Sequence, residues 1–343
     1  MPSGKKSTAQ STSIMKDKLI QASSKSAAGD TVTVLLYDFA EEFAQLIQKR
    51  LPAVRVLTAK DTSSLDEQVS QADVLLAHTF PVDILDKARR LRWFQSASAG
   101  VETLLPIRDR IEELIVTSVR GMHGEIIADY VMTGIAMMHW NLPQFPKDQS
   151  RKAWQPRALA PLAGQTLGVV GLGSIGAAIA RRGQAFGMRV IGSKRDTSEP
   201  VDCVDKLYPP EDVSDLLRLS DFLVLAVPQV PETFRLIGRE QLRLMRRSAV
   251  LVNIARGSVV AESELIDALK AGTIAGAVLD VFEREPLAAD SPLWNMPNVI
   301  VTPHIAGWMS DYDDRVLEIF NDNLERYVDK QPLRNVVDLS RGY

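Results

Sequence analysis

The stretch from residue 166 to residue 186 constrains the fold of this chain more than any other. A short apolar run, residues 166–170, leads directly into Gly171-Leu172-Gly173-Ser174-Ile175-Gly176, and an amphipathic segment follows over 175–186. Glycines at this spacing between a strand and a helix are typical of a dinucleotide-binding turn. Gly171 permits the tight turn, Gly173 lets a pyrophosphate approach the backbone, and Gly176 lets the helix pack closely on the strand.

Short apolar runs alternate with amphipathic segments along the rest of the chain, which predicts parallel strands covered on both faces by helices. The first series of expected strands is 31–37, 54–57, 74–77, 93–96 and 115–118, with helices at 41–50, 63–71 and 82–88. The second series is 166–170, 189–192, 222–227, 249–253, 276–280 and 299–301. The sequence therefore predicts an α/β protein with two doubly wound parallel-sheet domains, one Rossmann-like and one flavodoxin-like.

The segments between and after the two series set the expected domain boundaries. A long helical stretch at 124–140 is followed by residues 141–161, which contain four prolines and are typical of an irregular connection. A last helix at 311–328 has no strand of its own and can pack back on the first domain. We expect a substrate-binding domain from 31–123 and 307–343, and a dinucleotide-binding domain from 124–306. Residues 1–30, rich in Ser and Lys, are expected to form a disordered tail.

Composition excludes several classes of function. A net charge of −3 over 343 residues gives no basic excess for nucleic acid. No apolar run approaches the roughly 20 residues that cross a bilayer, so no membrane partner is expected. A single cysteine, Cys203, rules out an internal disulfide and a cysteine zinc cluster, and no metal is expected. A reducing cytoplasm is the expected location.

The end of the strand after the glycine turn bears on the choice of cofactor. NAD-binding proteins carry an acidic residue here for the ribose 2′-hydroxyl. This chain reads Gly192-Ser193-Lys194-Arg195, with no carboxylate before Asp196. Lys194 and Arg195 would attract a 2′-phosphate, and arginine can pair with it through two hydrogen bonds. NADP is therefore the predicted cofactor, with NAD left open.

Three later segments carry residue types that suit catalysis, each at or just after a predicted strand end. They read Asn253-Ile254-Ala255-Arg256-Gly257, Asp280-Val281-Phe282-Glu283-Arg284-Glu285-Pro286 and Thr302-Pro303-His304. Ligands of open α/β sheets bind outside the carboxyl ends of the strands, so these segments should converge on the side of the glycine turn.

With the glycine turn, these segments make four motifs in the order found in D-isomer-specific 2-hydroxyacid dehydrogenases, and the chain resembles that family over roughly residues 31–340. The resemblance implies an active site in the cleft between the domains, with Arg256, Glu285 and His304 as catalytic residues. Hydride reduction of a ketone leaves negative charge on oxygen, so His304 would donate the proton. Glu285 would orient the imidazole and favour its protonated form, and Arg256 would grip the substrate carboxylate and polarise the keto oxygen.

Other site residues are predicted with less specific motifs. Asp280 matches a family aspartate that contacts the nicotinamide amide, Val227 and Pro228 should lie against the adenine, and Thr233 is a weaker candidate. The remaining predicted cofactor contacts are Ser174, Ile175, Ser193, Ile254 and Ala255. Small residues Ser98, Ala99 and Gly100 would let backbone N–H groups bind the substrate carboxylate, with Arg256 and Trp308 as further substrate contacts. The other three histidines, His78, His123 and His139, are interpreted as structural. His78 is a weak exception because it follows a strand end.

The function that the resemblance implies is hydride transfer between NAD(P)H and a small 2-keto acid to give the D-2-hydroxy acid. Glyoxylate and hydroxypyruvate are the favoured substrates, given the likeness to NADPH-using reductases, and larger aryl or branched keto acids stay open. A homodimer is expected, with the 124–140 helix and the proline-rich stretch after it as the interface. The alternative is a dinucleotide-sensing, corepressor-like binding protein. Zinc alcohol dehydrogenases are excluded by the absent cysteines, and formate dehydrogenases have Gln where Glu285 stands.

Overall fold

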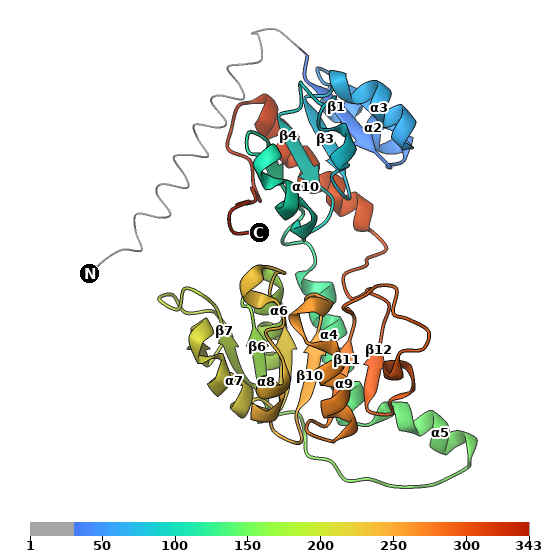
Figure 1. Ribbon diagram of the computed structural model, residues 1–343, viewed down its shortest axis with the longest axis vertical. Coiled ribbons are helices and arrows are strands. Elements are labelled where there is room, and N and C mark those ends of the chain that lie inside the picture. Colours follow the sequence, from blue (N-terminus) through green and yellow to red (C-terminus); the bar gives the residue numbers. More distant parts are fainter. Residues whose placement is uncertain (1–30, 343) are drawn as a thin grey trace. The chain divides into compact units, whose positions relative to one another are not determined.

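A computed structural model of the chain describes residues 31–342, and the expected tail at 1–30 lies outside the described residues. The contacts divide the described chain into two compact units (Figure 1). The first unit holds residues 31–120 and 311–342, and the second holds Gly121–Ser310. The expected domain boundaries lie at 123/124 and 306/307, close to these divisions.

The first unit is built on a five-stranded sheet in the order β2-β1-β3-β4-β5, with every pairing parallel. This is the flavodoxin-like order, and its strand order reverses between β1 and β3. The strands are apolar almost throughout because both faces are covered, and Leu35 and Leu75 are fully buried. Its elements are β1 (Thr33–Tyr37), α2 (Glu41–Arg50), β2 (Arg55–Ala59), α3 (Thr62–Gln68), β3 (Val74–Ala77), β4 (Trp93–Ser96), β5 (Ile115–Thr117) and α10 (Tyr312–Val328).

One helix that the sequence predicts in this unit does not form. Residues 82–88 were predicted to be helical, but only a three-residue 3-10 turn forms, η2 (Val82–Ile84). The amides of Leu85, Lys87 and Ala88 each bond a carbonyl three or four residues back, giving separate tight turns instead of a continuous helix. Two further 3-10 segments, η1 (Val69–Gln71) and η3 (Glu102–Arg110), complete the connections.

The last helix, α10, packs against the first sheet. Its apolar stripe recurs every four residues at Val316, Phe320 and Leu324, all fully buried. The Phe320 ring stacks on Trp93 of β4 with centroids 5.3 Å apart, and Tyr327 lies at the same distance from that indole. Helix α10 therefore covers a sheet whose strands lie more than 190 residues earlier in the chain.

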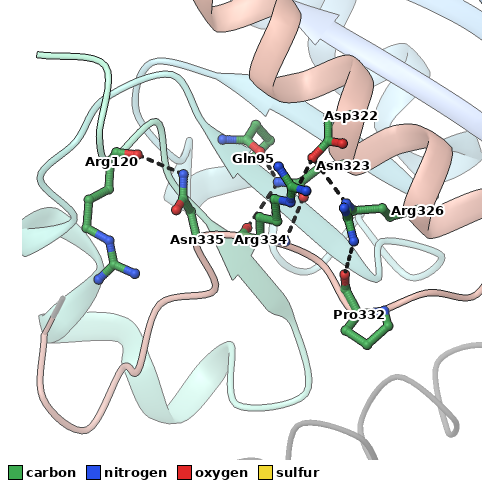
Figure 2. Close-up of polar contacts among 8 residues, drawn as sticks. All are labelled: Gln95, Arg120, Asp322, Asn323, Arg326, Pro332, Arg334 and Asn335. Carbon is green, nitrogen blue, oxygen red and sulfur yellow. Dashed lines mark hydrogen bonds and ion pairs between the residues drawn. The ribbon is translucent and has the colours of Figure 1, made fainter.

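A buried polar network fastens the segment after α10 to the same sheet (Figure 2). Asn323 is fully buried, and its side-chain amide donates to Gln95 Oε1 at 3.3 Å and to the Arg334 carbonyl at 3.1 Å. Its Oδ1 accepts the Arg334 amide at 2.8 Å. Asn335 then donates to the Arg120 carbonyl at 2.8 Å. Satisfied buried amides of this kind specify one position for the segment.

The second unit contains a seven-stranded parallel sheet in the order β12-β11-β10-β9-β6-β7-β8 (Figure 1). The strand order reverses between β6 and β9, which is where open α/β sheets bind their ligands. Its strands are β6 (Thr166–Val170), β7 (Arg189–Ser193), β8 (Lys206–Tyr208), β9 (Phe222–Leu225), β10 (Val250–Asn253), β11 (Gly276–Leu279) and β12 (Val299–Val301).

The helices of this unit cover the sheet on both faces, with fully buried side chains such as Val224 and Leu251 between the layers. They are α4 (Gly124–His139), α5 (Phe145–Ser150), α6 (Ser174–Ala185), α7 (Val213–Leu219), α8 (Arg239–Leu244) and α9 (Glu262–Lys270). Short 3-10 turns lie at η4 (Leu142–Gln144), η5 (Pro210–Asp212), η6 (Pro231–Thr233), η7 (Gly257–Val259) and η8 (Pro292–Asn295).

The two predicted parallel α/β domains are confirmed by these sheets. Two details differ: β8 was not predicted, because three residues between polar neighbours give no apolar run, and 141–161 is less irregular than expected because it contains α5. Within residues 31–342, no helix combines the length and apolar character needed to cross a membrane.

Candidate active site

The glycine turn between β6 and α6 has a separate steric reason for each glycine. Gly171 has φ +100°, and a Cβ there would lie 2.5 Å from the carbonyl oxygen of Ala226, the residue after β9. A Cβ on Gly176 would lie 2.0 Å from the Gly171 carbonyl oxygen, so only glycine lets α6 pack this closely. Gly173 differs, since nothing lies within 4 Å of its Cβ position. The open space there, at the N-terminus of a 12-residue helix, fits a pyrophosphate.

The end of β7 is bonded directly to this turn. The Ser193 carbonyl accepts the amides of Gly171 and Leu172 at 3.0 and 3.1 Å, so residues 193–195 lie beside the glycine turn. Lys194 donates from Nζ to the Glu199 carbonyl at 2.8 Å. Asp196 faces Ser198, whose hydroxyl and amide donate to Oδ1 at 2.6 and 3.0 Å and hold the pKa of that carboxyl below its usual value.

The loop after β9 lies on the other side of the glycine turn. Val227 is close enough that a Cβ on Gly171 would meet its Cγ1 at 2.9 Å. Thr233 donates its hydroxyl to the Pro228 carbonyl at 2.6 Å, which closes the loop on itself. Val227 and Pro228 therefore lie at the point where the strand order reverses, and Thr233 shapes the loop.

Arg256 leaves β10 in a segment held by Asn253. The buried Asn253 side chain accepts the Ala255 amide and donates to the Arg256 carbonyl, both at 3.1 Å. The next residue, Gly257, packs directly against the backbone of Phe282. A Cβ at Gly257 would lie 1.8 Å from the Phe282 carbonyl carbon. This contact explains the glycine that follows Arg256, because no side chain would let this segment approach the one that carries Glu285. Ile254 and Ala255 are buried beside it.

Glu285 and His304 form the central pair of the site. Glu285 Oε2 lies 2.7 Å from His304 Nδ1, and Glu285 Oε1 accepts the Phe282 amide at 3.0 Å. The carboxylate therefore bridges its own loop and the imidazole. The side chains of His304 and Glu285 are 46% and 37% exposed, so the ring is held at Nδ1 and remains partly exposed.

Asp280 is buried and already engaged within the chain. Its two carboxylate oxygens accept the amides of Ile305 and Ala306, both at 2.9 Å, and Oδ1 also accepts the Thr302 hydroxyl at 2.6 Å. The expected contact with a nicotinamide amide stays a prediction. The observed bonds give Asp280 a part in holding the segment that carries His304.

His123, interpreted from the sequence as structural, lies beside two site segments. It is buried, a Cβ on Gly307 would meet its Cδ2 at 3.1 Å, and the Arg256 charge acts on it. Burial first, and the Arg256 guanidinium second, hold the pKa of His123 below 6.5. No ordered motif surrounds this histidine, so the sequence offered no signal for its position beside Gly307, within range of the Arg256 charge. The exposed Trp308 follows Gly307 directly.

The predicted carboxylate-binding residues belong to the first unit. Ser98, Ala99 and Gly100 form the loop after β4, and the Ser98 hydroxyl donates to the His78 carbonyl at 3.2 Å. His78 stacks on Phe39 with centroids 5.2 Å apart, so residues after β1 and β3 meet where that sheet's strand order reverses. His78, the histidine set apart from the structural ones because it follows a strand end, therefore lies at this reversal point.

These residues can bind a dinucleotide at Gly171–Gly176 and move a proton at His304. Within the described residues, no three His, Cys, Asp or Glu side chains gather where they could hold a metal ion. A parallel sheet with a glycine turn at its reversal point, and a histidine–carboxylate pair after later strands of the same sheet, are typical of a nicotinamide-dependent oxidoreductase.

Comparison with known proteins agrees with this class. Residues 132–306 match the family model described as D-isomer specific 2-hydroxyacid dehydrogenase, NAD binding domain. A glyoxylate reductase of Korarchaeum cryptofilum is 37% identical over 270 residues, covering 75% of this chain and 80% of the relative. A D-3-phosphoglycerate dehydrogenase of Methanocaldococcus jannaschii is 32% identical over 90% of this chain, and the match spans 60% of that longer protein.

A solved structure extends the comparison to both units. The NADPH-dependent glyoxylate/hydroxypyruvate reductase of Sinorhizobium meliloti, in complex with NADP and sulfate, has a TM-score of 0.82 and 26% identity. The match covers 92% of this chain and 100% of that one. The chain belongs to the D-isomer specific 2-hydroxyacid dehydrogenase family. The predicted family, the enzyme class and the nicotinamide cofactor are thereby confirmed, with a small 2-keto acid as the class of substrate.

The lowered pKa of His123 predicts how stability changes with acidity. The unfolded chain takes up this proton near pH 6.5 and the folded chain only at lower pH, so stability present above pH 6.5 is lost as the pH falls through the folded pKa. We expect the thermal midpoint of His123→Gln to fall less than that of the wild type between pH 7 and pH 5. If the thermal midpoints of the two proteins fell by the same amount, His123 would not contribute to this loss of stability.

Proposed function

We propose that this enzyme reduces glyoxylate or hydroxypyruvate with NADPH to the D-2-hydroxy acid, with His304 as the proton donor. The observation that carries the proposal is the His304–Glu285 pair, held at 2.7 Å through Nδ1 with the ring half exposed. When bound, the nicotinamide supplies the hydride. Gly171, Gly173, Ser174, Ile175 and Gly176 would hold its pyrophosphate.

The chain's own residues then provide binding and proton transfer. His304 Nδ1 is engaged by Glu285, which leaves Nε2 to donate a proton to the oxygen that becomes the hydroxyl. Arg256 would bind the substrate carboxylate through two parallel hydrogen bonds and stabilise charge on the keto oxygen. The amides of Ser98, Ala99 and Gly100 and the side chain of Trp308 stay predicted substrate contacts.

The experiment is to follow the nicotinamide absorbance of purified protein with NADPH or NADH and a panel of 2-keto acids. Glyoxylate and hydroxypyruvate should give the highest kcat/KM, above aryl and branched acids. Faster turnover of a larger acid would overturn the substrate assignment and keep the enzyme class. Tight cofactor binding without turnover of any acid would favour the dinucleotide-sensing alternative.

The cofactor preference is a second part of the proposal. The Ser193 carbonyl is bonded to the glycine turn, so Lys194 and Arg195 lie beside the predicted pyrophosphate site. The Asp196 carboxylate, which could repel a 2′-phosphate, is bonded to Ser198. Two cations near a phosphate and an engaged carboxylate favour NADPH over NADH.

Replacing Arg195 by glutamine should therefore weaken NADPH selectively. A hydrogen bond between charged groups contributes about 1.5–3 kcal/mol, so the Kd for NADPH should rise about ten- to hundredfold while that for NADH stays within twofold. Fluorescence titration of both cofactors measures this. Arg189→Gln, at the other end of β7, is the matched control and should change neither Kd. Equal weakening of NADH and NADPH by Arg195→Gln would contradict the phosphate contact.

The homodimer is a further expectation that the surface of the second unit supports. Helix α4 uses its apolar face inside its own unit, where Val131 and Ile135 are fully buried. Large apolar side chains are exposed along the stretch that follows, including Trp140, Phe145 and Trp154, the last with 95% of its surface exposed. Exposed apolar surface of this kind is typical of an interface with another chain. A second copy is the partner that the family resemblance implies.

Light scattering tests this association. We expect the mass of a dimer for the wild type and a shift toward monomer for Trp154→Ser combined with Phe145→Ser. Phe234→Ser, at an exposed position in the same unit but away from this stretch, should leave the dimer intact. A wild-type monomer at micromolar concentration would contradict the expectation.

A further inference from the structure

Asp280 holds the segment that carries His304 through several hydrogen bonds. Its carboxylate accepts the Ile305 and Ala306 amides at 2.9 Å and the Thr302 hydroxyl at 2.6 Å, and its main-chain carbonyl accepts the His304 amide at 2.9 Å. Four hydrogen bonds to one residue therefore surround the histidine on both sides along the chain.

These bonds hold His304 in an unfavourable backbone conformation. Its φ of +54° lies in the left-handed region, which residues with a side chain rarely adopt unless the surrounding contacts impose it. The direction of the imidazole toward Glu285 depends on that conformation.

The hydrogen bonds continue from Asp280 to a residue that the predicted site did not include. Thr302 Oγ1 lies 2.6 Å from the Tyr130 hydroxyl. A carboxylate only accepts, so the single Thr302 proton points to Asp280, and the Tyr130 hydroxyl must donate to Thr302. Burial raises the pKa of Tyr130 to about 12, so the phenol keeps its proton at neutral pH. The order of donors is thereby fixed, and each bond strengthens the next.

Tyr130 lies on a tightly packed helix. It lies on α4 between Ala128 and Val131, which are fully buried, and α4 packs so closely on α6 that a Cβ on Gly124 would lie 3.2 Å from Ala178 Cβ. A helix packed in this way is a more precise support than a loop.

We propose that Tyr130 is a positioning residue for the proton donor, acting through Thr302 and Asp280 on the backbone and ring of His304. The inference rests on the proposed function for its effect on turnover. Its effect on the orientation of the histidine is independent of substrate.

The test is Tyr130→Phe, which removes the hydroxyl and keeps the ring. Loss of one hydrogen bond in the chain should lower kcat about five- to tenfold. The KM for the keto acid and the Kd for NADPH should stay within twofold. Thr302→Val removes the next link, and the double variant should be no slower than Thr302→Val alone. Tyr327→Phe is the matched control, a buried tyrosine of the first unit that contacts Trp93, and should leave kcat within twofold.

A second readout needs no turnover. The chain has four histidines, so the ring ¹⁵N signals of His304 can be assigned by their loss in His304→Gln. They should move in Tyr130→Phe and stay in Tyr327→Phe. Unchanged kcat and unchanged ring signals would overturn the proposal, as would a rise in KM with kcat preserved. If the wild type reduces no keto acid, the proposed function fails, and the ring signals alone decide whether Tyr130 positions His304.

Discussion

Replacing His304 by glutamine should lower kcat by about 10²- to 10⁴-fold, the range that a positioned general acid contributes. Glutamine can still reach Glu285 but cannot carry the proton that reduction of the ketone requires. The Kd for NADPH should change less than threefold, because the glycine turn and the end of β7 are formed by other segments. Single-turnover reduction followed by nicotinamide absorbance separates the two effects.

The same substitution at another histidine is the control. His139, at the end of α4, bonds the Ala160 carbonyl at 2.7 Å and has no part in the proposed chemistry. His139→Gln should keep wild-type kcat. A His304→Gln enzyme within threefold of wild type would show that the proton comes from another group, and the role assigned to the pair with Glu285 would then be wrong.

Replacing Arg256 by lysine should lower kcat/KM by about 10²- to 10³-fold, the loss typical of removing a donor that stabilises a developing oxyanion. Lysine keeps the charge but presents a single ammonium in place of the planar fork that matches a carboxylate. We expect KM to rise and kcat to fall, because the proposed contacts are to the substrate carboxylate and to the reacting oxygen. Steady-state kinetics across a range of keto acid concentrations resolves the two terms.

Arg239→Lys provides the comparison, since that exposed arginine on α8 pairs with Asp267 on the surface of the same unit. It should leave both constants unchanged. If Arg256→Lys raised KM alone and left kcat intact, Arg256 would bind the substrate without stabilising the transition state.

The sequence predicted the strands well because most of them are short, apolar and buried on both faces. The expected 74–77 and 166–170 coincide with β3 and β6. Prediction failed where a segment is stabilised by a neighbour in place of its own pattern. Strand β8 forms because its three residues, Lys206–Tyr208, pair with residues 191–193 of β7. The pattern of Lys206–Tyr208 alone does not predict a strand.

For the site, motifs in the sequence predicted the proposed catalytic residues but not the residues that pack against them or bond to their segments. The Thr302-Pro303-His304 segment identified His304, but the φ of +54° and the bonds to Asp280 depend on tertiary contacts. His123 directly precedes α4 and Tyr130 lies within it, yet they contact Gly307 and Thr302, more than 170 residues later in the chain. A pattern read along one chain cannot show that proximity. The reason for Gly257, a contact with the Phe282 backbone, likewise became clear only from the structure.

Hydride transfer from NADPH to the keto carbon is tested with NADPH that carries deuterium in place of both hydrogens at C4 of the nicotinamide, and with hydroxypyruvate as the acceptor. The product is analysed for label by mass spectrometry and for configuration by chiral chromatography. We expect D-glycerate carrying one deuterium at C2. L-glycerate, or D-glycerate without deuterium at C2, would contradict it.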